Sequence, residues 1–470
     1  MRMASLPSQR GCASKPLLVW PEFVAGDSIF FRGLMTGLGD SQAWSLDAFS
    51  QGQPKQLASL LRWAVEHSPH YRGIGMRARK LISLAEKPRQ FWEQWQELPL
   101  LTKTTLRVVG NSIHARTLPP DHPSIGSTLT SGSTGTPVEV RGTRITQMLW
   151  EALTLREHLW QRRDFSKRLG IIRYCSPDER EPLGTDFTSW GAPVASLYST
   201  GPASVIHNGL PIKAYVAWLQ RFDPHYLLTY PSIGAELMRS MEGVNIKPRS
   251  LEEIRFIAEP LGRYLEENLK TEWAVRSTDI YSANEVGYIA FRCPEQRNLH
   301  VQSETILVEI LDEHGLPCAP GQQGRVVVTP LHNFATPLIR YELGDYATPG
   351  KPCSCGRSSP VIEKILGRVR NLLRTPDGNT SWPVGFAIIR SVKPILQSQW
   401  VQTSLDTIQL RVVLERPLNE REREEVTRHA RHVLGYPFKV EIVTVHQIER
   451  GPTGKFEEFL SQLAGQAVSN

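Results

Sequence analysis

Apolar positions recur three and four residues apart between about residues 54 and 110, as in LASLLRWAVEHSPHYR and PRQFWEQWQEL. This spacing lines one face of a helix, so the pattern predicts an α-helical entry region. From 125 to 300, short apolar runs such as RLGIIRYC, HYLLTYPS and IRFIAEPL alternate with helical segments such as KAYVAWLQRF and IGAELMRSM. The alternation predicts βα units on a largely parallel sheet, and therefore an α/β fold.

The patterning changes after residue 300. The segments TILVEILDEHG, GRVVVTPL and LIRYEL predict an antiparallel β subdomain over about 299–347, placed against the α/β core. After GRVRN at 367–371, the runs QLRVVLE and KVEIVTV flank a charged helix that Asn419 would cap. We therefore expect a large N-terminal α/β domain over 1–366 and a small, mobile α+β domain over 367–470.

Composition and charge narrow the functional classes. The 470 residues include 54 Lys and Arg against 47 Asp and Glu, and these charges are scattered singly, which argues against a nucleic-acid partner. The sequence contains no run of 18 or more apolar residues, so it predicts no membrane span. Six cysteines are too few for a disulfide-stapled scaffold, so a reducing cytoplasm is the expected location.

The segment LTSGSTGTPVEV, at 129–140, concentrates Ser, Thr and Gly in one short loop between apolar runs. Such a loop can bring amide and hydroxyl donors to phosphate oxygens, although Ser/Gly/Thr loops are also common as simple turns. It lacks the spacing and the lysine of a Walker loop. The candidate phosphate-binding residues are Thr130, Ser131, Gly132, Ser133, Thr134 and Gly135.

Three cysteines and one histidine form a second candidate site. Cys293 and His300 occur in CPEQRNLH, and Cys353 and Cys355 occur in CSCG. Three thiols and one imidazole suit a closed, structural zinc site if the fold joins the two pairs. From spacing alone, unrelated buried cysteines explain the pattern as well. The remaining cysteines, which have no partner pattern, are Cys12, Cys175 and Cys318.

The order of further motifs adds a resemblance. HSPHYR, LPLLTK, TSGSTGTP, TYPS, IAEP, YSANE, IRYELGD, CSCGR and GPTGK follow one another from residue 67 to residue 455. In this order the chain resembles the adenylate-forming superfamily of acyl-CoA synthetases, adenylation domains and luciferases, and within it the phenylacetate–CoA ligase branch. Val138 stands where many superfamily members carry lysine, as in that branch.

The resemblance implies an enzyme that activates a carboxylic acid with ATP and Mg²⁺ as an acyl-adenylate, releasing pyrophosphate, and then transfers the acyl group to a thiol, first of all coenzyme A. The Ser/Thr loop would hold the leaving phosphates, Glu285 would help to hold Mg²⁺, and Asp345 would accept hydrogen bonds from the ribose. The residues implied around adenine are Ala258, Glu259, Pro260, Tyr281 and Ser282. Those implied around the acid are Tyr230, Pro231, Ala283 and Asn284.

The resemblance also assigns roles in the small domain. Lys455, in GPTGK, would be the catalytic lysine that the domain inserts into the site, where its ammonium stabilises developing charge. Arg368, next to Gly367, lies at the expected hinge and is a second candidate catalytic residue. The chain departs from the family after it, because Arg370 and Asn371 replace acidic residues. That departure bears on the hinge and on the second half-reaction.

The resemblance favours the zinc set over unrelated cysteines, since similar Cys-Pro…His and Cys-x-Cys-Gly elements occur in the phenylacetate branch. It leaves the acceptor open between coenzyme A, an amine and a carrier-protein thiol, as in amide or ester synthetases of biosynthetic pathways. A non-catalytic nucleotide-binding homologue is a third alternative. The many Trp and Tyr residues hint at an aryl acid, and related enzymes are often homodimers.

Overall fold

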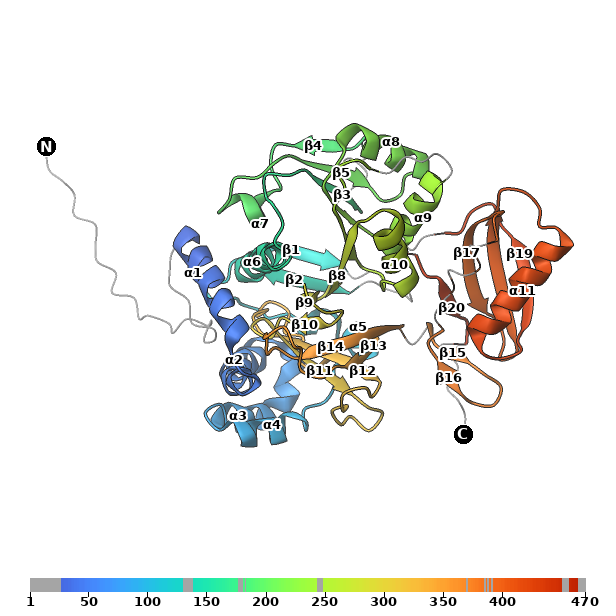
Figure 1. Cartoon of the computed structure of the whole chain (residues 1–470). Helices are drawn as coiled ribbons and strands as arrows, with labels where there is room; N and C mark the ends of the chain where they lie inside the picture. Colours follow the sequence, from blue (N-terminus) through green and yellow to red (C-terminus); the bar gives the residue numbers. More distant parts are fainter. Residues whose placement is uncertain are drawn as a thin grey trace, which may run out of the picture.

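The computed structural model describes residues 27–129, 138–175, 181, 183–242, 248–368, 371–383, 386, 389, 392–449 and 456–463. The predicted phosphate loop from Thr130 to Gly135, the predicted catalytic Lys455 and Arg370 lie outside these residues. Figure 1 shows a large body, in blue to orange, with a smaller domain, in red, beside it.

The entry region is helical, as its periodicity predicts. The helices are α1 (Asp27–Asp40), α2 (Leu46–His67), α3 (Gly75–Ser83), α4 (Pro88–Trp95) and α5 (Lys103–Val109). Ser45 caps α2 by accepting a hydrogen bond from the amide of Ala48, which satisfies one of the free donors at the helix start. Leu57, Leu60 and Leu61 form the buried stripe of α2. This stripe packs on the antiparallel strands of the large sheet.

A mixed sheet of 12 strands runs through the large body in the described residues, in the order β11-β12-β13-β14-β10-β9-β8-β7-β6-β3-β5-β4. Its parallel part contains β3 (Leu169–Arg173), β5 (Ala203–His207), β6 (Tyr226–Thr229), β7 (Glu253–Ile257) and β8 (Arg276–Ala283). The short edge strand β4 (Thr185–Phe187) is antiparallel to β5. The predicted α/β fold is confirmed.

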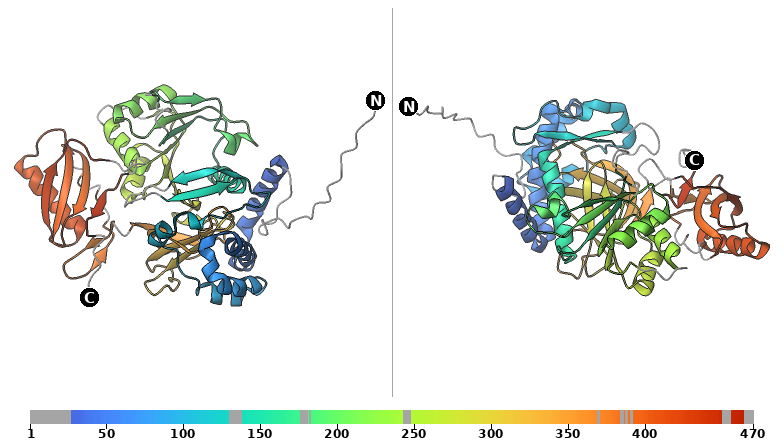
Figure 2. Two further views of the ribbon diagram at one scale, coloured as in Figure 1. Left: turned by 180° about the vertical axis from the view of Figure 1, so that it is seen from behind. Right: turned by 90° about the horizontal axis from the view of Figure 1, so that it is seen from above.

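Helices cover both faces of this parallel part (Figure 2). One face packs against α1 and α6 (Arg144–Trp160). The other packs against α8 (Ile212–Phe222), α9 (Pro231–Glu242) and α10 (Arg263–Glu272). The strands are buried on both sides, which explains their continuous apolar runs in the sequence. A short helix, α7 (Ala192–Ala195), lies between β4 and β5 in the chain.

The antiparallel strands continue the same sheet. They are β9 (Gly287–Arg292), β10 (Leu299–Val301), β11 (Ile306–Leu311), β12 (Gly324–Pro330), β13 (Tyr341–Pro349) and β14 (Val361–Arg368). The predicted subdomain over 299–347 therefore omits β9 and β14, which pair with β10 on its two sides. The predicted strand LIRYEL is also only partly extended, because β13 begins at Tyr341.

The small domain has its own sheet and core. The sheet order is β19-β18-β17-β20, from β17 (Ile395–Gln402), β18 (Thr407–Leu414), β19 (Lys439–Thr444) and β20 (Phe459–Ser461). Helix α11 (Glu420–Leu434) begins after Asn419, whose side chain accepts from the amide of Glu422, as the sequence predicts. Trp400, Ile408 and Val426 are fully buried between helix and sheet. The hairpin β15 (Leu373–Arg374) and β16 (Thr380–Ser381) leads into this domain.

Among the described residues, no helix combines the length and the apolar character that crossing a membrane requires.

Candidate active site

The carboxyl ends of three neighbouring parallel strands bring the segments predicted around adenine and around the acid to one edge of the sheet. Tyr230 follows β6, the segment from Ala258 to Pro260 follows β7, and the segment from Ser282 to Glu285 ends or follows β8. Because β6, β7 and β8 are adjacent and parallel, their ends lie side by side. Ligands of α/β sheets bind in this position, outside the carboxyl ends of the strands.

Asp345 is the centre of a hydrogen-bonded group that joins this edge to the antiparallel strands. The Tyr281 hydroxyl donates to Asp345 Oδ2 at 2.8 Å, and Arg368 Nε donates to Asp345 Oδ1 at 3.2 Å. The carboxylate is mostly buried, with 13% of its side chain exposed. Each carboxylate oxygen has a further lone pair, so both retain the capacity to accept a ligand hydroxyl.

The electrostatic environment shows that Glu285 belongs to the same group. Burial, followed by the charge of Asp345, raises the pKa of the Tyr281 hydroxyl well above its usual range, and Glu285 adds to the effect. Burial and then Glu285 likewise raise the pKa of Tyr341. Although burial opposes it, Asp345 and Glu285 raise the pKa of the Arg368 guanidinium. The site therefore holds two carboxylates beside a permanent cation and two neutral phenols.

Glu259 occupies the turn after β7 and faces the start of α9. Its Oε2 accepts from the Ser232 amide at 2.9 Å, and its Oε1 accepts from the Ser232 hydroxyl at 3.1 Å. Oε1 also accepts from the backbone amide of Phe456, in the small domain, at 2.8 Å. The preceding residue, Ala258, has a left-handed backbone with φ of 69°. Strained backbone of this kind is concentrated at functional sites.

The predicted phosphate loop connects two paired strands, β1 (Ser124–Leu129) and β2 (Glu139–Thr143). Both runs that flank this loop form strands, and all six residues of β1 are exposed. Leu129 itself is 63% exposed. β1 pairs with β2, and its apolar residues Ile125 and Leu129 are exposed and do not contribute to the core.

Two motif residues to which the sequence assigned no role hold the segment before Asp345. The hydroxyl of Tyr71 donates to the carbonyl of Pro337 at 2.7 Å and accepts from the amide of Ile339 at 3.2 Å. Lys103, at the start of α5, reaches Gly344 so closely that a Cβ on Gly344 would lie 3.5 Å from the lysine Nζ. The motif order contained this signal, because both residues lie in the segments that resemble the family.

Further polar residues lie at the carboxyl ends of β3 and β5, next to the predicted site. His207 ends β5 and Asn208 follows it, and both are buried, as is Cys175 beyond β3. The sequence offered no pattern that singled out His207 or Asn208, and it placed Cys175 among the ordinary cysteines. They extend the same edge of the sheet, since β3 pairs with both β5 and β6.

The fold joins the two predicted halves of the zinc set. The ligand atoms of Cys293, His300, Cys353 and Cys355 all lie within 4.8 Å of one another. The Sγ atoms of Cys353 and Cys293 are 3.8 Å apart, and Cys355 Sγ is 3.3 Å from His300 Nε2. Tetrahedral zinc with Zn–S bonds of about 2.3 Å requires S···S distances of about 3.8 Å, so the spacing fits this ion.

The surroundings of His300 also suit a metal ligand. Burial, and then the charge of Arg357, lower the pKa of His300 to about 4, so its imidazole is neutral near pH 7. Its second ring nitrogen, Nδ1, lies 3.3 Å from the Ser359 hydroxyl. A partner on the second nitrogen fixes the orientation of a ligating imidazole. The arrangement is thus chemically able to hold a metal at a distance from Asp345 in the fold.

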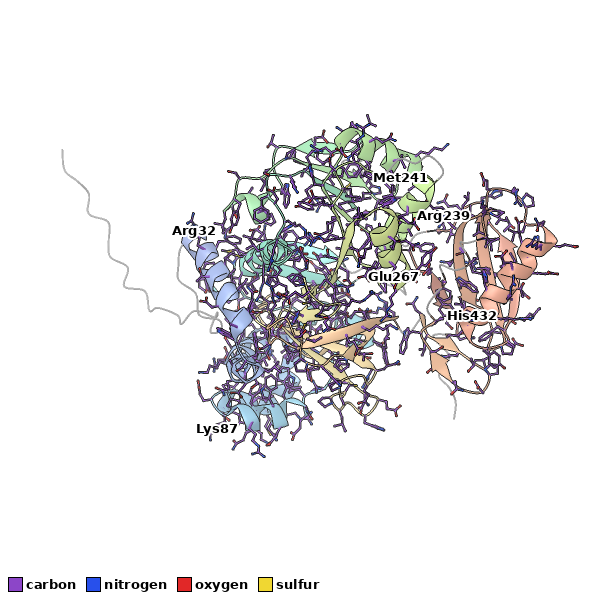
Figure 3. The ribbon with its side chains drawn as sticks, in the orientation of Figure 1. Arg32, Lys87, Arg239, Met241, Glu267 and His432 are labelled. Atoms are coloured by element: carbon purple, nitrogen blue, oxygen red, sulfur yellow. The ribbon has the colours of Figure 1, made fainter. Side chains whose placement is uncertain are left out.

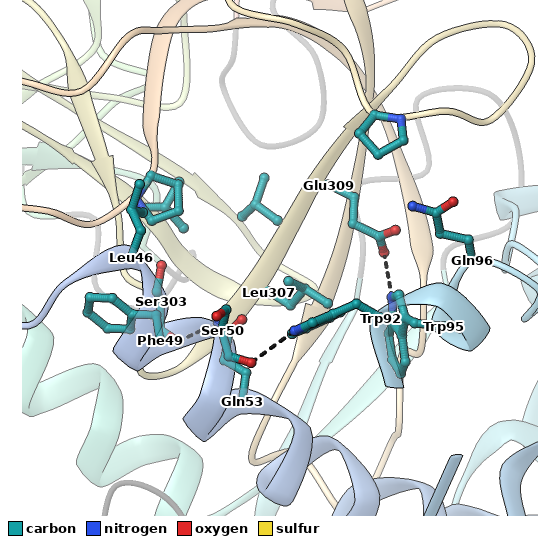
Figure 4. A pocket seen from close by; sticks show the side chains of 14 residues that line it. Leu46, Phe49, Ser50, Gln53, Trp92, Trp95, Gln96, Ser303, Leu307 and Glu309 are labelled. Atoms are coloured by element: carbon teal, nitrogen blue, oxygen red, sulfur yellow. Dashed lines mark hydrogen bonds between the residues drawn. The ribbon is translucent and has the colours of Figure 1, made fainter. Parts of the chain in front are cut away.

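A pocket of about 370 Å³ lies elsewhere, between α2, α4 and β11 (Figure 4). Its lining is mainly apolar and includes none of the predicted site residues. The carboxylate of Glu309 accepts from Trp95 Nε1 at 3.1 Å and pairs with Arg340 at 2.9 Å. The Glu309 carboxylate is therefore already bound by two side chains of the protein.

The chain is similar in sequence to several known proteins. Residues 375–461 match the family model described as the CapK C-terminal domain. Over 283 residues the chain is 26% identical to a phenylacetate-coenzyme A ligase of Thermus thermophilus, which covers 54% of this chain and 64% of that protein. A match to a phenylacetate-coenzyme A ligase of Escherichia coli is 23% identical and covers 67% and 70%. The match thus spans less than two thirds of the Thermus protein.

Among solved structures, the chain resembles 2-hydroxyisobutyryl-CoA ligase in the postadenylation state, in complex with R3-HIB-AMP. The TM-score is 0.69 at 20% identity, covering 90% of this chain and 92% of that chain. The predicted resemblance to the phenylacetate–CoA ligase branch, and the fold that it implies, are therefore confirmed.

Proposed function

We propose, from this likeness to phenylacetate–CoA ligases, that the chain activates a carboxylic acid with ATP as an acyl-adenylate and then transfers the acyl group to a thiol. The single observation that carries the proposal is the group around Asp345 at the carboxyl edge of the sheet. Its free lone pairs suit the two ribose hydroxyls, while Tyr281 and Arg368 hold the carboxylate in one orientation.

The remaining charges suit the other parts of the reaction. When the carboxylate attacks the α-phosphate, negative charge grows there and on the leaving pyrophosphate. Glu285, beside Arg368, offers a carboxylate for a Mg²⁺ that also binds phosphate oxygens. Lys103 lies next to Gly344 of β13 and adds a cation. We propose that the loop from Thr130 to Gly135 holds the phosphates and that Tyr230, Pro231, Ala283 and Asn284 border the acid.

Coenzyme A is the acceptor that we propose first, and an amine or carrier-protein thiol is the second candidate. Two observations favour keeping the second. The small domain matches a model named for CapK, and Arg370 and Asn371 replace the acidic residues that usually follow the hinge. Because both differences lie in the small domain or at its hinge, we keep the second candidate acceptor in the proposal.

The first test is pyrophosphate release with ATP and Mg²⁺ over phenylacetate, benzoate, 2-hydroxyisobutyrate and longer aliphatic acids. We expect release that depends on one class of acid, and a further increase when coenzyme A is present, with the thioester detected by mass spectrometry. Acid-dependent release that coenzyme A does not stimulate would identify the second candidate acceptor. No release with any acid, in a protein that binds ATP, would support the non-catalytic alternative and contradict the proposal.

We further propose that Cys293, His300, Cys353 and Cys355 hold a structural Zn²⁺. Four protein ligands fill a tetrahedral shell and leave no open position for a reacting group. The site also joins the end of β9 to the loop before β14, two segments that the sheet alone connects only through β10. Zinc bound at this site is therefore expected to stabilise the fold.

Metal analysis of the purified protein should find about one zinc ion per chain. We expect the double variant Cys353→Ser/Cys355→Ser to lose most of this zinc and to unfold at a lower temperature, by about 2–4 °C for each kcal/mol lost. Cys318→Ser is the matched control, because Cys318 lies outside the cluster. A double variant that keeps its zinc, or a wild-type protein that binds none, would contradict the proposed site.

A further inference from the structure

We propose that the outer face of the helical entry region is a docking surface for an anionic lipid bilayer, to which the protein binds from the water side. Six cations define this surface, which we call the basic face: Arg62, Arg72, Arg77, Arg79, Lys80 and Lys87. The inference goes beyond the proposed function, because it depends on neither the acid nor the acceptor. It requires no membrane span, since the protein would lie on the surface of the bilayer.

The sequence between residues 62 and 89 is strongly basic. It contains seven Lys and Arg residues against two carboxylates, Glu66 and Glu86, which gives this segment a formal charge of +5. The whole chain of 470 residues carries a formal charge of +7. In the linear sequence these cations are separated by other residues, so only the fold shows that they share one surface.

Helix α3 presents a polar stripe to solvent. Residues three and four positions apart lie on the same side of a helix. The exposed residues that share one side of α3 in this way are Met76, Arg79, Lys80 and Ser83. Met76 is 87% exposed, although its side chain is apolar. The opposite side of α3 is fixed in the core of the large body through Leu81, so the stripe stays turned outward.

Three further cations flank this stripe. Arg77 is the residue after Met76, and Arg72 lies in the 3₁₀-helix Pro69–Ile74, which leads directly into α3. Lys87 lies between the end of α3 and the start of α4, and Figure 3 shows it at the outer end of the entry region. All three side chains are exposed. The basic face therefore extends beyond both ends of α3.

Arg62 adds a cation from α2. It lies three residues before Val65, so both residues are on one side of α2. A Cβ on Gly75, the first residue of α3, would lie 3.6 Å from Val65 Cγ1, so this side of α2 contacts α3. Glu66 is the acid on the same side, and its carboxylate lies 3.8 Å from His67 Nε2. One carboxylate thus faces six cations.

The cations of the basic face are not neutralised by the protein itself. Among the described residues, none of the six forms an ion pair. Two neighbouring cations do have partners, since Lys55 binds Glu86 at 3.1 Å and Arg89 binds Glu93 at 3.4 Å. Like charges held close together repel one another, so an anionic partner that covers the basic face would relieve this repulsion.

The composition of the basic face favours a bilayer over a protein or a nucleic acid. The centre of a protein interface is depleted of charged residues. Nucleic acids are bound by cations together with amide or aromatic side chains that read or stack on bases, and the stripe of α3 offers neither. A bilayer accepts both kinds of side chain present, because lipid phosphates attract the cations and the headgroup region admits Met76. Clusters of about four to eight Lys and Arg on a helix are typical of anionic-lipid binding.

The position of the basic face suits such a contact. Figures 1 and 2 show α3 and α4 at an end of the large body that lies away from the small domain. A bilayer bound at this end would leave the small domain in water.

The test is co-sedimentation of the full-length protein with vesicles, without ATP or acid. We expect binding to vesicles of equal parts phosphatidylglycerol and phosphatidylcholine, and no binding to phosphatidylcholine alone. Binding should weaken as the salt concentration rises, because salt screens charges at a surface. Equal binding to both kinds of vesicle, or no binding to either at low salt, would overturn the proposal. Since no substrate is present, this result does not depend on the proposed function.

A double variant tests the basic face itself. Arg77→Ala/Arg79→Ala should bind the anionic vesicles about 30-fold more weakly, since each cation near such a surface contributes about fivefold. Arg423→Ala/Arg428→Ala is the matched control, because it removes two exposed arginines from helix α11 of the small domain and should bind as the wild type does. Alanine favours helices, so both variants should keep the wild-type Tm. Equal loss of binding in the two variants would show a general effect of charge and overturn the proposed surface.

Met76→Ser leaves the charge unchanged and should weaken binding to anionic vesicles about threefold, because its side chain no longer enters the headgroup region. An unchanged affinity would overturn the insertion of Met76.

Duplex DNA and polyglutamate test the other two classes of partner. Both should bind the wild type more weakly than the anionic vesicles do at the same salt concentration. Tighter binding to DNA would identify a nucleic acid as the partner, tighter binding to polyglutamate would identify an acidic protein, and either result would overturn the bilayer as the occupant.

Discussion

Lys455→Ala is expected to slow acid-dependent pyrophosphate release by about 10²- to 10³-fold, which is the usual cost of removing one preorganised charge-stabilising group. The ammonium would neutralise charge that develops between the carboxylate, the α-phosphate and the leaving group, and a small domain already docked needs no reorganisation at that moment. Lys455 lies outside the described residues, so its role stays a prediction from the sequence.

The measurement is a single-turnover assay of each half-reaction. Transfer from a supplied acyl-adenylate should keep most of its rate in Lys455→Ala, because the lysine is assigned to the first step only. Lys439→Ala is the matched control, since Lys439 belongs to the same domain, is mostly exposed and pairs with Glu441 on its own strand. If the two lysine variants lost adenylation equally, or if Lys455→Ala lost neither step, its assignment as the catalytic lysine would be wrong.

Asp345→Ala should raise the KM for ATP by about 10- to 100-fold, because it removes the proposed ribose acceptor and the carboxylate to which Arg368 donates. A mostly buried cation without its carboxylate is costly, so the variant should also unfold at a lower temperature. The KM for the acid should change less, since the acid is placed at the ends of β6 and β8.

Two further variants serve as comparisons for Asp345→Ala. Tyr281→Phe removes only the hydroxyl that donates to Asp345, so its effect should be near tenfold or below. Glu342→Ala, on the same strand, removes a carboxylate whose partner is Arg325 at 3.8 Å and should leave the KM for ATP unchanged. If Asp345→Ala kept the wild-type KM for ATP, the assignment of Asp345 to the nucleotide site would be wrong.

Local patterns predicted much of the fold because they depend on neighbouring residues. The runs that became β3, β6 and β7 are apolar since helices cover both faces of the sheet, and the segments that became α8 and α9 show helical spacing. The sequence did not predict that β1 is exposed, because its apolar residues look like core residues although no core lies beneath them. Local sequence also could not show that the antiparallel region includes β9 and β14. These two strands join it through pairing with β10.

For the candidate site too, the sequence predicted individual residues, whereas their contacts depend on the fold. The order of motifs predicted the Asp345 group, yet only the structure shows that Tyr281 and Arg368 bind the same carboxylate. The two halves of the cysteine cluster meet because β10, which carries His300, lies between β9 and β14. The contact of Glu259 with Phe456 spans 197 positions of sequence. No local pattern encodes a contact of that range.

The position of β20 bears on how this protein is made in the cell. This strand pairs with Trp400, Val401 and Gln402 of β17, synthesised some 60 positions earlier, and so completes the small sheet last. Domains fold largely in the order of synthesis, so the large body with Asp345 can form while β20 is still on the ribosome. Under the proposed function, a nascent chain would thus acquire its nucleotide site before β20 pairs with β17. Under the proposed function, this order of translation would keep an incomplete chain from consuming ATP.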